Sequence, residues 1–101
     1  MIVTTALSTA TEAALLTARV RYFAAAGEAA GTAGETLDLP AGATVAQLRD
    51  ALAGAHGPEL ARVLGISALL VDGRTDLADD APLPQRAGEV AVDVLPPFAG
   101  G

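Results

Sequence analysis

Short apolar segments recur along the chain, and in three of them apolar and polar residues alternate. Alternation with a period of two, rich in β-branched and aromatic residues, is typical of strands that bury one face. A fourth segment is an almost continuous apolar run closed by an Asp-Gly turn signal. We therefore expect strands at Arg19–Ala24, Glu35–Leu39, Ile66–Val71 and Glu89–Leu95.

One segment has helical rather than alternating periodicity. Thr44 is a typical N-cap residue, and Gly57-Pro58 is a stop signal. Between them, apolar residues recur at helical spacing and predict one buried stripe: Val45, Leu48, Leu52 and Ala55. The other connections predict only minor elements. These are a helical turn and a loop after the first strand, a short turn of helix over 58–65, and an irregular stretch over 74–87 with at most one brief strand.

The order of the elements predicts the fold class. Two strands, a crossover helix and further strands indicate an α+β domain with one main helix packed across a mixed sheet. In this ubiquitin-like β-grasp arrangement, the first and last strands lie side by side and parallel, joined through a right-handed crossover. The alternative is a split βαβ sandwich, which needs a second strong helix. We expect an N-terminal extension over 1–17, a β-grasp domain over 18–96 and a flexible, projecting tail over 97–101.

Charge and composition narrow the classes of partner and cofactor. The net charge is −6, and all six cationic residues are arginines. An acidic chain without a basic stripe is a poor candidate for binding nucleic acid or an anionic membrane, so we expect neither partner. The absence of cysteine and the single histidine, His56, argue against a metal site. The N-terminal segment lacks the cationic start of a secretory signal, which makes the cytoplasm the expected location.

The C-terminal residues have the properties of a projecting arm. Pro96 and Pro97 cannot donate strand hydrogen bonds and hold the chain extended. Gly100 and Gly101 lack side chains and therefore fit a narrow channel. The last carboxylate can thus be presented to a remote active site. A frayed end with permissive residues is the alternative reading of the two glycines.

Two motifs resemble the small subunit of molybdopterin synthase, a member of the ubiquitin-like sulfur carriers. VRYFA at 20–24 is similar to the opening strand of that family, and DVLPPFAGG at 93–101 is similar to its C-terminal signature. Together the resemblance covers about residues 18 to 101. The chain departs from the family in having no lysine near the base of the tail, and in having Thr75 where relatives often carry a large apolar residue.

The resemblance implies a non-catalytic sulfur carrier rather than an enzyme. It implies that an E1-like enzyme uses ATP to adenylate Gly101, and that a sulfur donor then converts the adenylate to a thiocarboxylate. Within molybdopterin synthase, the large subunit would use this sulfur to convert a cyclic pterin precursor to molybdopterin. No cofactor would be bound by the chain itself. Phe98, Ala99 and Gly100 would form the tail that carries Gly101.

A docking face is expected where the first and last strands meet. Phe23 and Leu95 lie on the same predicted face, with Arg21 and Asp93 as a cross-strand ion pair beside them. An exposed apolar patch beside a projecting arm indicates an interaction site. The resemblance places partner contacts at Phe23, Leu95, Pro96 and Pro97. The alternative is that Phe23 packs under the N-terminal extension.

Two other functions remain open. A related carrier could serve thiamine or cysteine synthesis, although thiazole carriers usually lack the Pro-Pro-Phe arm. A ubiquitin-like module could instead use the same terminus for conjugation or simply bind a partner.

Two weaker features favour structural roles. His56 is predicted to be a C-terminal helix cap, and the aspartates at 72, 76, 79 and 80 lack the spacing of a calcium loop.

Overall fold

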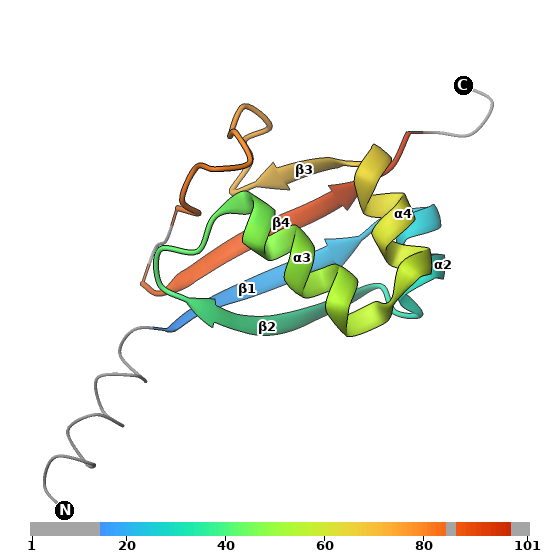
Figure 1. Ribbon diagram of the computed structural model, residues 1–101, viewed down its shortest axis with the longest axis horizontal. Coiled ribbons are helices and arrows are strands. Elements are labelled where there is room, and N and C mark those ends of the chain that lie inside the picture. The colour runs from blue at the N-terminus through green and yellow to red at the C-terminus, as the bar shows by residue number, and fades with distance from the viewer. Residues whose placement is uncertain (1–14, 85–86, 98–101) are drawn as a thin grey trace, which may run out of the picture.

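A computed structural model describes residues 15–84 and 87–97 of the chain (Figure 1). A four-stranded sheet forms one layer, and the two longer helices cover one of its faces. The elements in chain order are β1 (Leu15–Tyr22), α2 (Ala25–Ala30), β2 (Gly34–Pro40), α3 (Val45–His56), α4 (Pro58–Ile66), β3 (Ala68–Val71) and β4 (Glu89–Leu95). No helix in this described part is long and apolar enough to cross a membrane.

The strand order β2-β1-β4-β3 confirms the predicted mixed β-grasp sheet. β1 and β4 are parallel neighbours at the centre, with Val20 opposite Val92 and Tyr22 opposite Val94. β2 pairs with β1, and β3 pairs with β4, both antiparallel. The predicted alternation therefore places one apolar row of each central strand against the helices. The rows are Leu16, Ala18, Val20 and Tyr22 of β1, and Val90, Val92 and Val94 of β4, all buried.

α3 begins where the sequence predicts. Thr44 and Gln47 form a reciprocal capping box, in which each side chain accepts the backbone N–H of the other residue, at 3.2 and 2.8 Å. Leu48 and Leu52 are fully buried as expected, whereas Ala55 is exposed and does not extend the stripe. The helix ends at Gly57, whose φ of 95° favours glycine.

Several boundaries differ from the prediction. β1 begins at Leu15 rather than Arg19, because β2 continues to Pro40 and supplies ladder partners for the earlier residues. Residues 15–17 therefore belong to the sheet and not to an N-terminal extension. β1 ends at Tyr22, because Ala24 turns the chain with a φ of 52°.

The segment between α3 and β3 also differs. α4 is a nine-residue helix rather than one short turn, and it buries Leu60, Val63 and Leu64. β3 consequently begins at Ala68 and not at Ile66. In the described part of 74–87 the structure has isolated bridges but no further strand.

Candidate functional site

The candidate site is the end of the sheet where β4 runs into the C-terminal residues. β4 lies between β1 and β3, so the chain leaves the sheet from a strand that is paired on both sides. Leu95 is the last residue of β4 and lies opposite Ala68. The side chain of Pro96 is buried, and Pro97 is exposed. The predicted tail residues Phe98, Ala99, Gly100 and Gly101 lie outside the described residues.

Phe23 lies beside this exit, as predicted. Its backbone N–H donates to the carbonyl oxygen of Val94 at 3.2 Å, which holds Phe23 next to the last residues of β4. The Phe23 side chain is 40% exposed, and Leu95 is half-buried. Of the four residues predicted to contact a partner, Phe23, Leu95 and Pro97 are thus accessible. Pro96 is not, and its burial instead fixes the point at which the chain leaves the domain.

The predicted ion pair between Arg21 and Asp93 is confirmed. The guanidinium donates from Nε and Nη2 to the two carboxylate oxygens at 2.8 and 2.9 Å. These hydrogen bonds and the charge of Asp93 raise the pKa of Arg21 above its ordinary value. The Arg21 guanidinium carbon also lies 5.5 Å from the centre of the Phe23 ring, within the range of a cation–π contact. The pair therefore connects β4 to the exposed aromatic ring.

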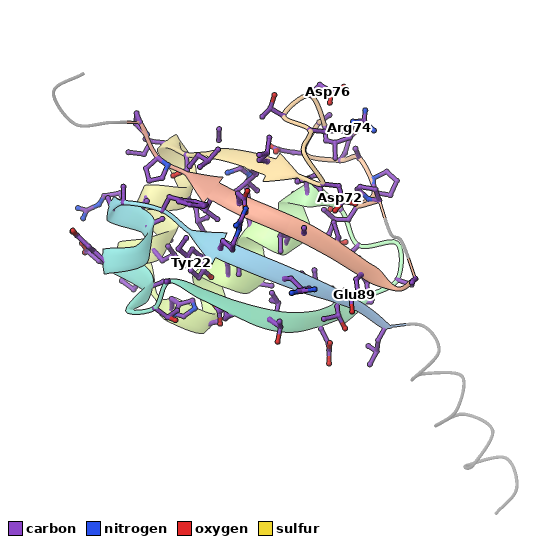
Figure 2. The ribbon with its side chains drawn as sticks, turned by 180° about the vertical axis from the view of Figure 1, so that it is seen from behind. Tyr22, Asp72, Arg74, Asp76 and Glu89 are labelled. Atoms are coloured by element: carbon purple, nitrogen blue, oxygen red, sulfur yellow. The ribbon has the colours of Figure 1, made fainter. Side chains whose placement is uncertain are left out.

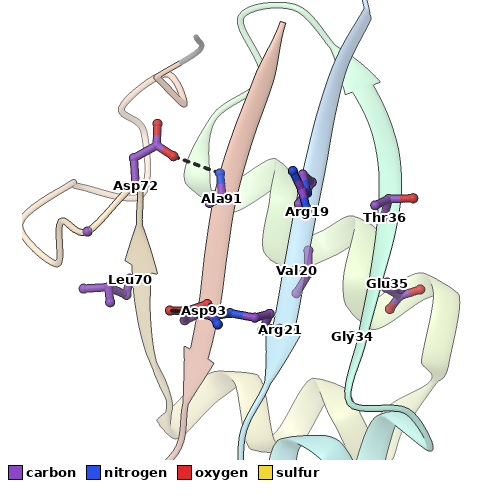
Figure 3. Close-up of a pocket in the computed structure, with 11 residues that line it drawn as sticks. Arg19, Val20, Arg21, Gly34, Glu35, Thr36, Leu70, Asp72, Ala91 and Asp93 are labelled. Atoms are coloured by element: carbon purple, nitrogen blue, oxygen red, sulfur yellow. Dashed lines mark hydrogen bonds and ion pairs between the residues drawn. The ribbon is translucent and has the colours of Figure 1, made fainter. Parts of the chain in front are cut away.

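The open face of the sheet holds a shallow hollow of about 860 Å³ (Figure 3). Leu70 and Ala91 contribute apolar surface, and Arg19, Arg21 and Asp93 contribute charge. Both arginines already have carboxylate partners, because Arg19 lies 3.7 Å from Glu89. Among residues 15–84 and 87–97, the hollow therefore offers no unpaired cation to an anionic ligand, and we assign the site to the end of the sheet.

One partly buried polar cluster was not predicted from the sequence. The Tyr22 hydroxyl donates to the carboxylate of Glu35, and the same oxygen contacts His56 Nε2. The rings of Tyr22 and His56 meet edge to face, with centroids 5.9 Å apart. His56 is therefore not the predicted helix cap, because the backbone N–H of Gly57 closes α3 instead. An acidic residue at an inward position of β2, in line with Leu37 and Leu39, is the signal that could have revealed the cluster.

The electrostatics of this cluster favour an ionised Glu35. Burial by itself would raise the pKa of Glu35, but the hydrogen bonds from Tyr22 and His56, and the charge of His56, lower it below its ordinary value. Burial and the adjacent carboxylate raise the pKa of Tyr22. The cluster joins β1, β2 and α3 near the end of β1 that precedes Phe23.

Three of the four aspartates after β3 have individual structural partners. Asp72 accepts a hydrogen bond from the backbone N–H of Ala91 at 2.9 Å, and Asp76 pairs with Arg74 at 3.1 Å. Asp79 lies 3.6 Å from Arg49. In Figure 2, which views the open face of the sheet, the Arg74–Asp76 loop projects from one corner of the domain. These partners support the interpretation of a solvated acidic turn.

Comparison with known proteins adds a family match. The model of the ThiS family matches residues 20–101, which include both motifs singled out in the sequence. No match is found among curated proteins.

Solved structures that share the fold include the following three, each more than one quarter identical in sequence. SAMP1 from Haloferax volcanii is 31% identical, with a TM-score of 0.67 over 84% of this chain and 99% of that one. A Pyrococcus furiosus protein assigned as molybdopterin converting factor, subunit 1, is 28% identical, with a TM-score of 0.66 over 82% and 99%. Subunits 1 and 2 of the Helicobacter pylori molybdopterin-converting factor form a protein–protein complex, and the matching chain is 26% identical, with a TM-score of 0.51 over 85% and 100%.

Proposed function

The chain belongs to the ThiS family, and from this premise we propose that it is a sulfur carrier whose working group is the carboxylate of Gly101. The observation that carries the proposal is the geometry at the end of β4. A strand paired on both sides leads to Pro96, which is buried, and to Pro97, which is exposed. The sequence that follows this rigid base ends in Gly100-Gly101, which lack side chains and therefore fit a narrow channel.

The chemistry needs activation by another protein. A carboxylate oxygen of Gly101 attacks the α-phosphorus of ATP, which forms the acyl-adenylate and releases pyrophosphate. Hydrosulfide supplied by a donor then attacks the acyl carbon, and AMP leaves with the former carboxylate oxygen. The product is a thiocarboxylate, whose sulfur is nucleophilic at neutral pH. We propose an E1-like adenylating enzyme and a separate sulfur donor as the partners in these two steps.

We further propose that the sulfur serves the synthesis of molybdopterin. The large subunit of molybdopterin synthase would receive the tail and use its sulfur to convert a cyclic pterin precursor. Two neighbours named as molybdopterin converting factor support this choice, and one of them was solved in complex with its second subunit. A carrier for thiamine or cysteine synthesis would use the same terminal chemistry, which is consistent with the ThiS family match.

Phe23, Leu95 and Pro97 are the proposed contact residues around the tail. Phe23 offers an aromatic ring, and Arg21 lies against it, so the contact surface combines apolar area with a paired charge. Aromatic residues and arginine are the types most often found at the centre of protein interfaces. Pro96 supports these residues from the interior of the domain.

Intact-mass measurement tests the proposal. The full chain is produced together with its adenylating enzyme and sulfur donor, and the terminal residue is analysed. We expect a mass increase equal to the difference between sulfur and oxygen, located at Gly101. Deletion of Gly101, or addition of one residue after it, abolishes this increase while the fold is retained. An unchanged mass in the wild-type chain would contradict the proposal.

Protein conjugation is the second candidate, favoured by the 31% identity to SAMP1, a small archaeal modifier protein. The adenylated Gly101 would then form an amide with a lysine of a target protein. This chain contains no lysine, so it would not itself accept a modifier at a side-chain amine. Isopeptide-linked products in cells, identified by mass spectrometry, would support conjugation over sulfur transfer.

A further inference from the structure

Large apolar side chains are exposed at both ends of the domain. In residues 15–84 and 87–97, three have high exposure: Leu15 at 42%, Phe23 at 40% and Ile66 at 65%. Phe23 and Ile66 lie near the C-terminal end of β4, whereas Leu15 begins β1 at the opposite end of the sheet. The exposed apolar surface near this end of β4 therefore includes Ile66, which is not among the predicted contact residues.

Local structure holds Ile66 beside the base of the tail. It is the last residue of α4, and Ser67 closes the helix with a side-chain hydrogen bond to the carbonyl of Val63 at 2.7 Å. The next residue, Ala68, lies opposite Leu95, the last residue of β4. Figure 1 shows α4 ending next to the C-terminal end of β4.

Ile66 and Phe23 lie near the C-terminal end of β4 in different layers. Ile66 is the last residue of α4, in the helical layer, whereas the Phe23 ring lies against Arg21, which lines the hollow on the open face. The neighbours of Ile66 are small, because Gly65 and Ala68 are exposed and carry little side chain. Ile66 therefore stands above its surroundings and makes no contribution to the buried core.

The length of the tail restricts where a partner can lie. Gly101 follows Pro97 by four residues, and an extended chain spans at most about 3.6 Å per residue, so Gly101 reaches about 14 Å from Pro97. An enzyme that binds ATP and adenylates Gly101 must enclose the reacting carboxylate within this distance. Its surface consequently lies close to Pro97 and to the residues at this end of the sheet.

We propose that Ile66 is a docking residue for the adenylating enzyme, whose entrance closes around the base of the tail and contacts Phe23 on one side and Ile66 on the other. This inference rests on the proposed function. The occupant of the surface is a protein with an apolar rim, since an exposed isoleucine contributes to binding through the burial of apolar area. The apolar contact is thus two-sided, and Ile66 adds to it from the helical layer.

Adenylation kinetics test the inference. ATP–pyrophosphate exchange is measured with the adenylating enzyme of the same organism, and the concentration of the full-length carrier is varied. We expect Ile66→Ser to raise the KM for the carrier about tenfold with little change in kcat, as expected for a docking residue. Leu15→Ser is the matched control, because it removes a similarly exposed apolar side chain from the far end and leaves both constants unchanged.

Two further variants separate docking from folding. Ile66→Leu keeps the apolar side chain and should retain the wild-type KM. Ile66→Gln keeps good helix propensity and should raise the KM as Ile66→Ser does, with an unchanged melting temperature. A wild-type KM for both Ile66→Ser and Ile66→Gln would overturn the inference and leave the proposed function intact. If the wild-type chain is not adenylated at all, the proposed function itself is wrong.

Discussion

Arg21 and Asp93 lie opposite each other on the two parallel central strands, and the guanidinium donates a hydrogen bond to each carboxylate oxygen. The parallel register brings the two residues together, although most of the chain separates them in sequence. The same arginine contacts the ring of Phe23, a proposed docking residue. The ion pair therefore connects β4, the strand that precedes the tail, to this ring.

Removal of this pair should affect docking more than stability. Exposed ion pairs contribute little to folding, so we expect Arg21→Ala to keep a urea unfolding midpoint close to that of the wild type. The KM of the adenylating enzyme for the carrier should rise about two- to fivefold, because the cation–π contact no longer orients Phe23. Arg19→Ala is the control, since its guanidinium lies 3.7 Å from Glu89 and farther from the tail. Equal KM values for the two variants would contradict this role of Arg21.

The Tyr22–Glu35–His56 cluster should make stability dependent on pH. The folded pKa of Glu35 is lower than its ordinary value of 4.5, so its ionised form stabilises the fold at pH values above that value. This contribution is lost as the pH falls through the folded pKa. At neutral pH we expect Glu35→Gln to lower the free energy of unfolding by about 1–3 kcal/mol, because hydrogen bonds to a charged group are lost.

Urea unfolding over a range of acidic pH values measures this effect. The difference between wild type and Glu35→Gln should be constant near neutrality and shrink on acidification. Glu28→Gln, which changes an exposed glutamate on α2, should run parallel to the wild type throughout. A difference between wild type and Glu35→Gln that does not change with pH would show that the carboxylate charge is not involved.

The two prolines should have separable roles. Pro96 is buried, so Pro96→Ala should lower the free energy of unfolding by about 1 kcal/mol through lost packing. Pro97 is exposed, and Pro97→Ala should change stability by less than about 0.5 kcal/mol. Pro97→Ala should instead raise the KM for adenylation, because the base of the tail becomes less stiff. Thermal unfolding and ATP–pyrophosphate exchange on both variants check this division, and equal losses of stability would refute it.

The capping box gives a prediction for the fold alone. Thr44→Ala removes the acceptor for the Gln47 N–H and should lower the free energy of unfolding by about 1 kcal/mol. Thr36→Ala, at an exposed position of β2, is the comparison. Sulfur loading at Gly101 should be unchanged in Thr44→Ala, which separates loss of stability from loss of function. Circular dichroism in urea measures the stability of both variants.

Periodicity was sufficient to predict most of the fold. The alternation in β1 and β4, together with one capped helix, favours the β-grasp arrangement over a split βαβ sandwich, and the β-grasp arrangement has a parallel central pair. That pair aligned Arg21 with Asp93 and placed Phe23 beside the exit of the tail. Periodicity did not define the start of β1, because residues 15–18 join the sheet through their ladder with β2 rather than through a strong strand pattern of their own. Ladder partners from elsewhere in the chain are not visible in a local pattern.

The polar cluster was missed for a related reason. Tyr22, Glu35 and His56 come from three different elements, and each residue has an ordinary local explanation when it is read alone. Their convergence depends on how α3 crosses β1 and β2. The sequence predicts Ile66 in a strand, because Gly65 is a stop signal for a short helical turn, whereas α4 continues for one further residue. Its exposure became evident only once the helix was placed.

The central position of β4 has a mechanical consequence. A partner that binds the tail can exert a pulling force along the axis of this strand. Such a force acts in shear on the hydrogen bonds from β4 to β1 and β3 at the same time. Bonds loaded in this way must rupture collectively, whereas a strand at the edge of a sheet could be peeled away bond by bond. The domain should therefore resist unfolding when a partner pulls on its C-terminal residues.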